Sequence, residues 1–280
     1  MAVEAPGWLS SGVPDPKGPV AAAEHLVLLN ATVIMLAIIV PVIVLTLAFA
    51  WWFRAGNKWA RRAPDWSYSG PVEVLVWSVP LLVIMFLGGI AWLASHDLDP
   101  RKPLASEQAP LDIQVVSLDW KWLFLYPEGE VATVNHLVVP SGRPLRLHLT
   151  SASVMNSFFV PQLGSQIYTM AGMATQLHLQ ADHVGSFPGL SAQFSGERFS
   201  DMRFVVNAVK PQDFEAWLAK AKSGPDALDM GAYRTLAQPG VSAAATYTLR
   251  TPELFDAIVR GAGQPEAGRT FTEGSICSAN

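Results

Sequence analysis

The chain has 280 residues, of which 50% are hydrophobic, and this composition leaves room for a membrane part and one folded domain. Its formal net charge of −4 comes without a basic patch or a nucleic-acid-binding motif, so nucleic acid is excluded as an expected partner. The single cysteine, Cys277, excludes an internal disulfide bond and a metal site built from cysteines.

Residues 1–25 are polar and rich in proline, and they lack the short apolar core of a signal peptide. Either a signal has been removed or none exists. The stretch 26–52 contains no Asp, Glu, Lys or Arg. As a helix it would reach roughly 40 Å, which exceeds the ~30 Å hydrocarbon core of a bilayer. We therefore expect a first membrane span over 26–52.

A second uncharged stretch, 74–94, would form a helix about 31 Å long and is expected to cross the membrane as well. The alternative is a pair of core helices in a soluble protein, which would have to hide both stretches on all sides. The two lengths together favour a transmembrane hairpin.

The connecting loop, 53–73, decides the orientation of this hairpin. Four cations precede Glu73 in the loop, and Asp65 is the one acid near them. These cations are Arg54, Lys58, Arg61 and Arg62. The positive-inside rule places such a loop in the cytoplasm, and both termini and the rest of the chain on the outer, periplasmic side.

A Pro-rich, charged linker, 95–110, precedes a region with a different pattern. Residues 111–210 contain at least seven short runs of β-forming residues between glycines and prolines, which predicts an antiparallel sandwich or a small barrel. Two histidines fall at polar-face positions of alternating strands, and the other four show no mutual spacing that would chelate a metal. We expect all six at the surface: His25, His96, His136, His148, His178 and His183.

The segment 211–262 has a helical pattern. Its first part, PQDFEAWLAKAK, places four apolar residues on one helix face: Phe214, Trp217, Leu218 and Ala221. Its last part predicts a helix with Thr251 as N-cap and Gly261 after its end. We expect these amphipathic helices to pack on the sandwich, the alternative being a separate functional domain. Residues 263–280 are expected to be disordered.

The loop 191–202, SAQFSGERFSDM, has the spacing of a two-copper electron-transfer site, C-x-x-x-C-x-x-x-H-x-x-M. The ligand positions hold Ser191, Ser195, Phe199 and Met202. Thiolates and imidazoles hold copper, whereas a neutral hydroxyl is a poor ligand and phenylalanine offers none. One methionine cannot hold two copper ions, so we predict no metal in this chain.

The order of the parts, two spans, a β-domain, the motif DWKW and this loop, resembles subunit II of the haem-copper respiratory oxidases over about 15–261. In copper-bearing members, a cupredoxin sandwich holds a dinuclear centre through two Cys, two His, one Met and a backbone carbonyl. The resemblance implies that these ligand positions correspond to Ser191 and Ser195 for Cys, Asn156 and Phe199 for His, Met202 for Met, and Gln193 for the carbonyl. Those relatives use a carboxylate near magnesium at the position of Gln193, and the neutral amide weakens that expectation.

Loss of the copper centre marks the quinol-oxidising branch, the cytochrome bo-type ubiquinol oxidases. Long stretches such as DWKWLFLYPEGEVATVNHLVVP closely resemble that branch. The resemblance implies a proton-pumping complex in a bacterial inner membrane, in which quinol delivers electrons to a partner subunit I that holds the haems and the remaining copper. Smaller membrane subunits and lipid are further expected partners, cytochrome c is not, and this chain would hold no cofactor.

Two alternatives stay open at this point. One is a cytochrome c oxidase subunit with unusual copper ligands, and the other is a stand-alone membrane-anchored binding module. Bo-type relatives commonly carry a lipid-modified cysteine before the DPKG stretch, whereas WLSSGVPDPKG, residues 8–18, has none. A lipid anchor is therefore not expected.

Glu73 stands at the cytoplasmic mouth of the second span, where an acid is costly unless it is functional or lies at the headgroup level. The alternative is an interfacial carboxylate in water. The resemblance implies a place near the entrance of a proton channel toward the oxygen-reducing site in subunit I, and we expect Glu73 to collect protons there.

Trp120 and Trp122 of the DWKW motif match the aromatic segment that carries electrons to copper in copper-bearing relatives. Without copper that role has no acceptor. We expect both tryptophans to pack against the loop 191–202 and subunit I, with Trp120 as the one that could retain a part in coupling.

Overall fold

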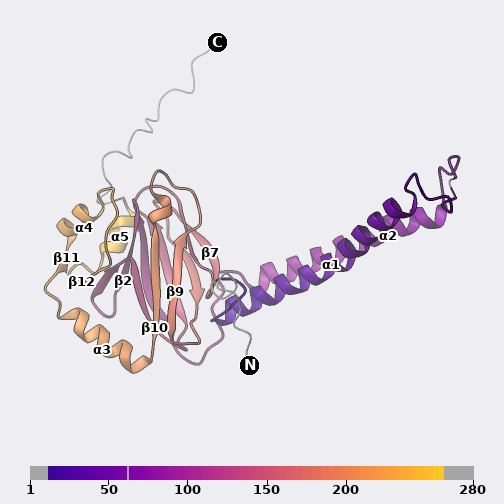
Figure 1. The fold of residues 1–280 in the computed structure, drawn as a ribbon. Helices are drawn as coiled ribbons and strands as arrows, with labels where there is room; N and C mark the ends of the chain where they lie inside the picture. Colours follow the sequence, from indigo (N-terminus) through magenta and orange to yellow (C-terminus); the bar gives the residue numbers. More distant parts are fainter. Residues whose placement is uncertain (1–11, 62, 262–280) are drawn as a thin grey trace, which may run out of the picture. The chain divides into compact units, whose positions relative to one another are not determined.

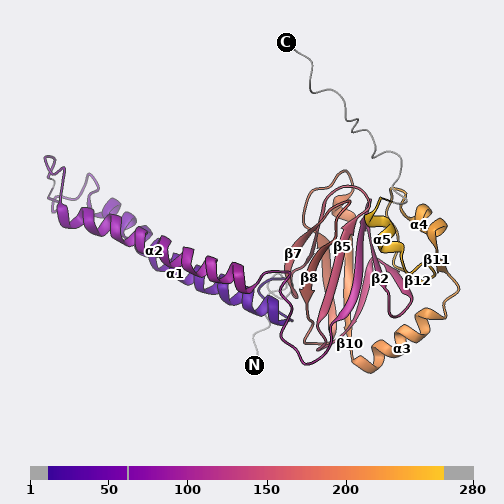
Figure 2. The same cartoon turned by 180° about the vertical axis from the view of Figure 1, so that it is seen from behind.

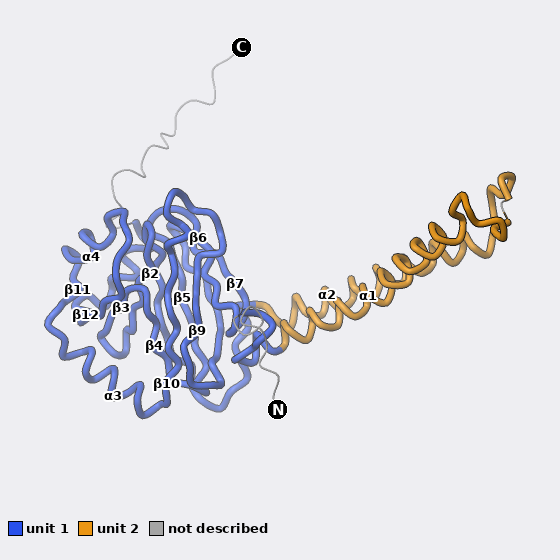
Figure 3. Tube along the Cα trace, in the orientation of Figure 1, with its two compact units in different colours: residues 1–22, 100–280 blue, residues 23–99 orange. Residues whose placement is uncertain are grey.

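The computed structural model describes residues 12–61 and 63–261. The chain divides into two compact units, which are 1–22 with 100–280, and 23–99 (Figure 3). We call the first unit the β-domain and the second the hairpin. The expectations for the first eleven residues, for the tail 263–280 and for Cys277 fall outside the described residues.

The hairpin contains helix α1 (Pro19–Trp52), except for its first four residues, and helix α2 (Gly70–Asp97), and the two run alongside each other in Figure 1. Both are longer than the charge-free stretches, because polar residues such as Glu24 and His96 end an apolar run without ending a helix. Pro71 lies in the first turn of α2, where its missing N–H costs nothing. Both helices also continue through the prolines in their interiors.

The two helices are about 51 Å and 42 Å long at 1.5 Å per residue, enough to cross a membrane. Within the most apolar window of each helix, none of the residues is buried. A core helix of a soluble protein would be buried on most sides, so the exposure disfavours that alternative.

The β-domain is built from two sheets. The seven-stranded sheet has the order β11 (Ala227–Leu228), β12 (Ala245–Leu249), β3 (Val131–Val134), β2 (Lys121–Tyr126), β1 (Leu111–Leu118), β5 (Leu145–Ser151) and β8 (Thr175–Leu179). The five-stranded sheet has the order β4 (His136–Pro140), β10 (Arg203–Val209), β9 (Gly185–Ser191), β6 (Asn156–Val160) and β7 (Gly164–Thr169). A single turn of 3₁₀ helix, η1 (Phe199–Asp201), precedes β10.

The β-sandwich predicted for 111–210 is confirmed, but its strands are not antiparallel throughout. Strands β1 and β5 pair in parallel, as do β4 with β10 and β11 with β12, so both sheets are mixed. The alternation of residues reveals where a strand is and which face is apolar, but not its partner. The chain leaves the seven-stranded sheet after β3 to form β4 in the other sheet, and returns as β5 in the direction of β1.

The main core lies between the two sheets and contains a group of aromatic side chains: Trp122, Phe124, Phe158 and Phe204. A second apolar cluster lies on the other face of the seven-stranded sheet, where Leu123 and Leu125 contact residues of the C-terminal helices. Strand β2 is therefore buried on both faces along its whole length. Its sequence, KWLFLY, shows no clean alternation for this reason.

The segment 211–262 was expected to be helical. The structure shows that it contains strands as well as helices. Helices α3 (Pro211–Lys222), α4 (Met230–Leu236) and α5 (Leu254–Val259) are present, but β11 and β12 add two strands to the edge of the larger sheet. Figures 1 and 2 show α4 and α5 on the side of the sandwich where β11 and β12 lie. The sequence identified α3 by its apolar stripe and α5 by its end signals, but it did not identify α4. The two short strands depend on the sheet edge that β3 offers.

Two local expectations were also wrong. Thr251 is not the N-cap of α5, because Pro252 and Glu253 form a turn and Glu253 takes the capping position. His178 is not at the surface: it is 6% exposed, because the linker covers strand β8 and the carbonyl of Pro100 lies 3.2 Å from Nδ1 of His178. Gly261 follows the end of α5 with φ 85°, as expected for a glycine in that place.

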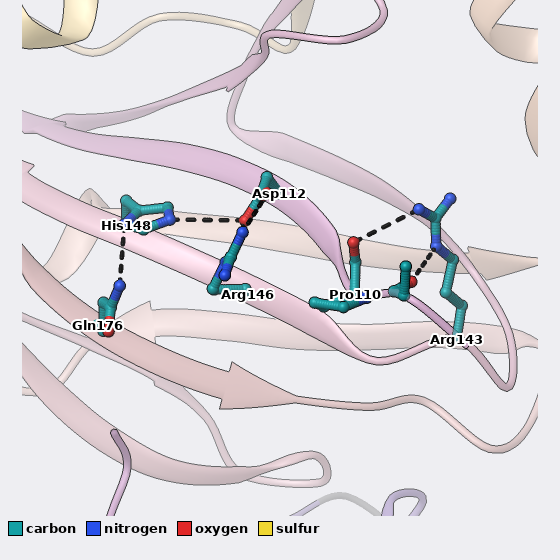
Figure 4. Close-up of polar contacts among 7 residues, drawn as sticks. Pro110, Asp112, Arg143, Arg146, His148 and Gln176 are labelled. Atoms are coloured by element: carbon teal, nitrogen blue, oxygen red, sulfur yellow. Dashed lines mark hydrogen bonds and ion pairs between the residues drawn. The ribbon is translucent and has the colours of Figure 1, made fainter. Parts of the chain in front are cut away.

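A polar cluster lies on the outer face of β1 and β5 (Figure 4). Asp112 is the register partner of Arg146, whose Nε and Nη2 both donate hydrogen bonds to its carboxylate. Nε2 of His148 lies 3.5 Å from Oδ1 of Asp112. The hydrogen bond from Arg146 holds the pKa of Asp112 below its usual range, with smaller contributions from the charges of Arg146 and His148 and against a desolvation effect that raises it.

Because the pKa of Asp112 is depressed in the folded state, its contribution to stability is present above the unfolded pKa of about 4 and is lost as the pH falls through the folded pKa. We therefore expect Asp112→Asn to lower stability at pH 7 by at most about 1 kcal/mol, since the pair is partly exposed. The difference from the unmodified chain should shrink below about pH 4. Thermal unfolding between pH 7 and 3 measures it, with the exposed Glu107→Gln as control. A difference that stays constant to pH 3 would contradict the assignment.

Candidate functional site

The loop 191–202 joins β9 to β10, and its two ends lie together. The N–H of Ser191 donates to the carbonyl of Met202 at 3.1 Å, and the N–H of Ala192 donates to the carbonyl of Ser157 at 3.0 Å. Ser191 is also the register partner of Phe158 on β6. Strand pairing therefore places the start of β6, the end of β9 and the start of β10 at one place in the sandwich.

Four of the predicted copper-site positions are joined there by side-chain contacts. Oγ of Ser191 donates to Oδ1 of Asn156 at 3.1 Å, and Oγ of Ser195 lies 3.9 Å from the sulfur of Met202. Asn156, Ser191 and Met202 are at most 4% exposed. The structure thus brings together residues that are up to 46 positions apart in the sequence, from Asn156 to Met202.

The remaining two positions lie at the margin of this cluster. The carbonyl oxygen of Gln193 lies 3.4 Å from Oγ of Ser191, as an alternative acceptor for the one hydroxyl proton. The ring of Phe199 meets that of Phe194 at a centroid distance of 5.0 Å, and Phe194 itself is 69% exposed. A largely apolar cavity of about 490 Å³ adjoins the cluster and is lined by residues of β9, η1 and β10, including Leu190, Phe199, Met202 and Phe204.

The donors gathered here are one amide, two hydroxyls and one thioether. Dinuclear copper requires thiolates and imidazoles, so these residues do not fit such a centre. In the described ranges 12–61 and 63–261, no group of three His, Cys, Asp or Glu residues could hold a metal ion. Chemically, the cluster can close the end of the sandwich by hydrogen bonding, but it offers no electron acceptor.

The tryptophans of the DWKW motif differ in their surroundings. Trp122 is fully buried, its ring packs edge-on against Phe158 at 5.4 Å, and its Nε1 donates to the carbonyl of Met202 at 3.4 Å. Trp120 is partly exposed and has a φ of 94°, which a non-glycine residue rarely adopts. Its ring lies against the backbone of Gly196 in the loop 191–202. Both tryptophans therefore contact this loop.

Glu73 is positioned by the first turn of α2, in the hairpin and outside the β-domain. Its side chain is exposed, and Oε2 accepts a hydrogen bond from Nε1 of Trp77 at 3.1 Å. The spacing of four residues places both side chains on one face of the helix. Glu73 is thus a separate candidate, on a different unit from the copper-site positions.

Sequence reasoning missed Lys121. This lysine lies between the two tryptophans and is only 4% exposed, and its Nζ donates to the carbonyls of Leu236 and Gln238 at 2.9 Å each. Burial is the larger influence on its pKa and lowers it, whereas the nearby charge of Asp119 raises it. A charged residue inside the strand KWLFLY, whose other members are all apolar, was the available signal.

The clustering of the ligand positions predicts that the copper site can be restored. Asn156→His, Ser191→Cys, Ser195→Cys and Phe199→His, combined with the native Met202, should produce a coloured chain that binds two copper ions. The full-length purified chain with copper supplied is measured by visible and near-infrared absorption and by metal analysis. The same variant with Met202→Leu serves as the control and should show a shifted spectrum. A folded variant that stays colourless would contradict the prediction that these five positions still have the arrangement of copper ligands.

Comparisons with known proteins agree with this picture. Residues 113–209 match the family described as "Cytochrome C oxidase subunit II, periplasmic domain". The chain is 50% identical over 246 residues to "Cytochrome bo(3) ubiquinol oxidase subunit 2" of Pseudomonas aeruginosa, covering 88% of this chain and 74% of that protein. It is 47% identical over 247 residues to "Ubiquinol oxidase subunit 2" of Acetobacter aceti (88% and 80% covered), and 35% identical over 235 residues to "Quinol oxidase subunit 2" of Bacillus subtilis (83% and 73% covered). The chain therefore belongs to the family of ubiquinol oxidase subunits 2.

Proposed function

We propose that the chain is the membrane-anchored subunit II of a quinol:oxygen oxidoreductase in a bacterial inner membrane, and that it holds no redox centre. The observation that carries this proposal is the cluster of Asn156, Ser191, Ser195 and Met202, which lie together at the positions predicted for copper ligands and offer an amide, two hydroxyls and a thioether instead of thiolates and imidazoles. The family relationship supports the quinol as electron donor.

In this proposal electrons do not pass through the β-domain. Quinol dissolved in the membrane would deliver them to subunit I, which would contain the haems and the one copper ion of the complex. The oxygen-reducing site would also lie in subunit I, and smaller membrane subunits would complete the assembly. Cytochrome c would have no reason to dock on the β-domain, since no acceptor lies behind Trp120.

The β-domain would act as a periplasmic cap in assembly, with the loop 191–202 facing subunit I. Phe194 supports this assignment: its ring is 69% exposed and contacts Phe199, which lines the apolar cavity, and contact with a partner would remove this apolar surface from water. The exposed apolar surfaces of α1 and α2 would be covered by lipid and by helices of the partner subunits.

Glu73 would collect protons on the cytoplasmic side. The loop 53–69 between the two helices contains Arg54, Lys58 and Arg61, which supports a cytoplasmic position for it and for the start of α2. The carboxylate of Glu73 lies in the first turn of α2, and its side chain is exposed. The hydrogen bond from Trp77 would hold it in one orientation.

The purified complex should consume oxygen with a ubiquinol analogue as the reductant and show no oxidation of reduced cytochrome c. Copper analysis should give one copper ion per complex, because only subunit I holds one. Oxygen electrode measurements and the copper-to-haem ratio test both statements. A near-infrared band of a dinuclear copper centre, or purification of the chain without a haem protein, would overturn the proposal.

Replacing Glu73 tests the proton-collecting role. Glu73→Gln removes the titrating group at nearly constant size and should lower quinol-dependent oxygen consumption by about tenfold or more, whereas Glu73→Asp should retain most of it. Trp77→Phe serves as the matched control, since it removes the hydrogen bond and keeps the acid. Full turnover in an assembled Glu73→Gln complex with normal haem content would argue against the role.

A further inference from the structure

The turn between β1 and β2 has an unusual residue in its second position. Leu118 pairs with Lys121, so that Asp119 and Trp120 form a two-residue hairpin loop. Such loops place residues at positive φ, where glycine or asparagine is favoured because a β-carbon causes strain. Here Trp120 occupies that position with φ 94°. A bulky residue stays in this conformation only when its surroundings hold it there.

One of these surroundings is the loop 191–202. A β-carbon added at Gly196 would lie 2.4 Å from Cη2 of Trp120, so the indole ring lies directly on the glycine backbone. Gly196 also has a positive φ of 131°, and its carbonyl accepts the N–H of Phe199 at 3.3 Å. The position of the Trp120 ring and the path of the loop therefore depend on each other.

The other surroundings come from the C-terminal segment. The segment 236–242, which we call the loop 236–242, consists of the last residue of α4 and the loop that follows it. It makes four hydrogen bonds to Asp119, Lys121 and Asn135. Nζ of Lys121 donates to two carbonyls of this loop at 2.9 Å, and the N–H of Gly240 donates to the carbonyl of Asp119 at 3.1 Å. Nδ2 of Asn135 donates to the carbonyl of Ser242 at 2.7 Å.

Asn135 connects this set to the second tryptophan. Its Oδ1 accepts the N–H of Trp122 at 2.8 Å, and its own N–H donates to the carbonyl of Trp122 at 2.9 Å. Asp119 and Lys121, the two neighbours of Trp120 in the sequence, are thus both hydrogen-bonded to the loop 236–242. Lys121 is the central member, because it is a buried cation whose hydrogen bonds are to carbonyl oxygens and are stronger than neutral ones.

We propose that Lys121 is a positioning residue through which the C-terminal loop 236–242 holds Trp120 in its strained conformation against Gly196, and so keeps the loop 191–202 in the shape that a metal centre would otherwise impose. The C-terminal segment thereby determines the shape of the loop 191–202, which it reaches through Lys121 and Trp120. This inference goes beyond the proposed function and does not require that quinol is the substrate.

Hydrogen exchange of the full oxidase complex, followed by mass spectrometry, tests the coupling between the two loops. Lys121→Met keeps the length of the side chain and removes the ammonium group. Amides of both 236–242 and 191–202 should then exchange faster, by about tenfold or more, because hydrogen bonds of a buried charge are lost. Lys121→Arg retains the donors and should restore protection in both loops.

The matched control is Lys222→Met, which makes the same chemical change at a half-exposed lysine whose partner is Glu130 at 2.6 Å. It should leave exchange in 191–202 unchanged. If Lys121→Met does not assemble, Gly240→Ala decides the question: Gly240 has a φ of 153° with open space around it, so the added methyl group strains the loop 236–242 without a clash. It should accelerate exchange in both loops.

The inference is overturned if exchange quickens in 236–242 while 191–202 keeps its protection in a complex with normal haem content. It is also overturned if Lys222→Met loosens 191–202 as much as Lys121→Met does. Exchange needs no turnover, and oxygen consumption with quinol is measured separately on the same samples. A failure of the loop coupling is therefore distinguishable from a failure of the proposed quinol oxidase function.

Discussion

Aromatic packing between the two sheets is the constraint on which the end of the sandwich depends. Trp122, Phe158 and Phe204 come from β2, β6 and β10, and their ring centroids lie 4.9 to 5.6 Å apart. Rings of this kind bury about 150–250 Å² each, and such pairs add about 0.5–1.5 kcal/mol beyond their burial. This packing holds β2, β6 and β10 in position relative to one another. It therefore also sets the point at which the loop 191–202 enters β10.

The polar positions within that frame can then change without loss of the fold. A neutral hydrogen bond such as that from Ser191 to Asn156 contributes only about 1 kcal/mol, which is small beside the aromatic core. It satisfies two buried polar groups that would otherwise be costly. Under the proposed function, this domain would keep the loop at the predicted copper-site positions without carrying electrons, because the electron donor would arrive through the membrane.

The hairpin follows a different constraint, since the bilayer requires every backbone polar group to be satisfied inside the helix. Long apolar helices meet this requirement without contacts to other parts of the chain, and no residue in the most apolar window of either helix is buried. Polar chemistry is then confined to the helix ends, where Glu73 and Trp77 lie. The two units divide the proposed work between proton collection and a periplasmic cap.

Composition and spacing alone determined the two helices, the β-rich region, the amphipathic face of α3 and the absence of copper ligands at Ser191, Ser195 and Phe199. These features depend on local periodicity and on residue chemistry, both of which are written along the chain. Tertiary structure decided the parallel pairing of β1 with β5, the burial of His178 under the linker, the two added strands at the sheet edge, and the contacts of Lys121 with the loop 236–242. Each of these features joins segments that are far apart in the sequence. The local pattern of residues does not show which distant segment will pair with a strand, cover a side chain or accept its hydrogen bonds.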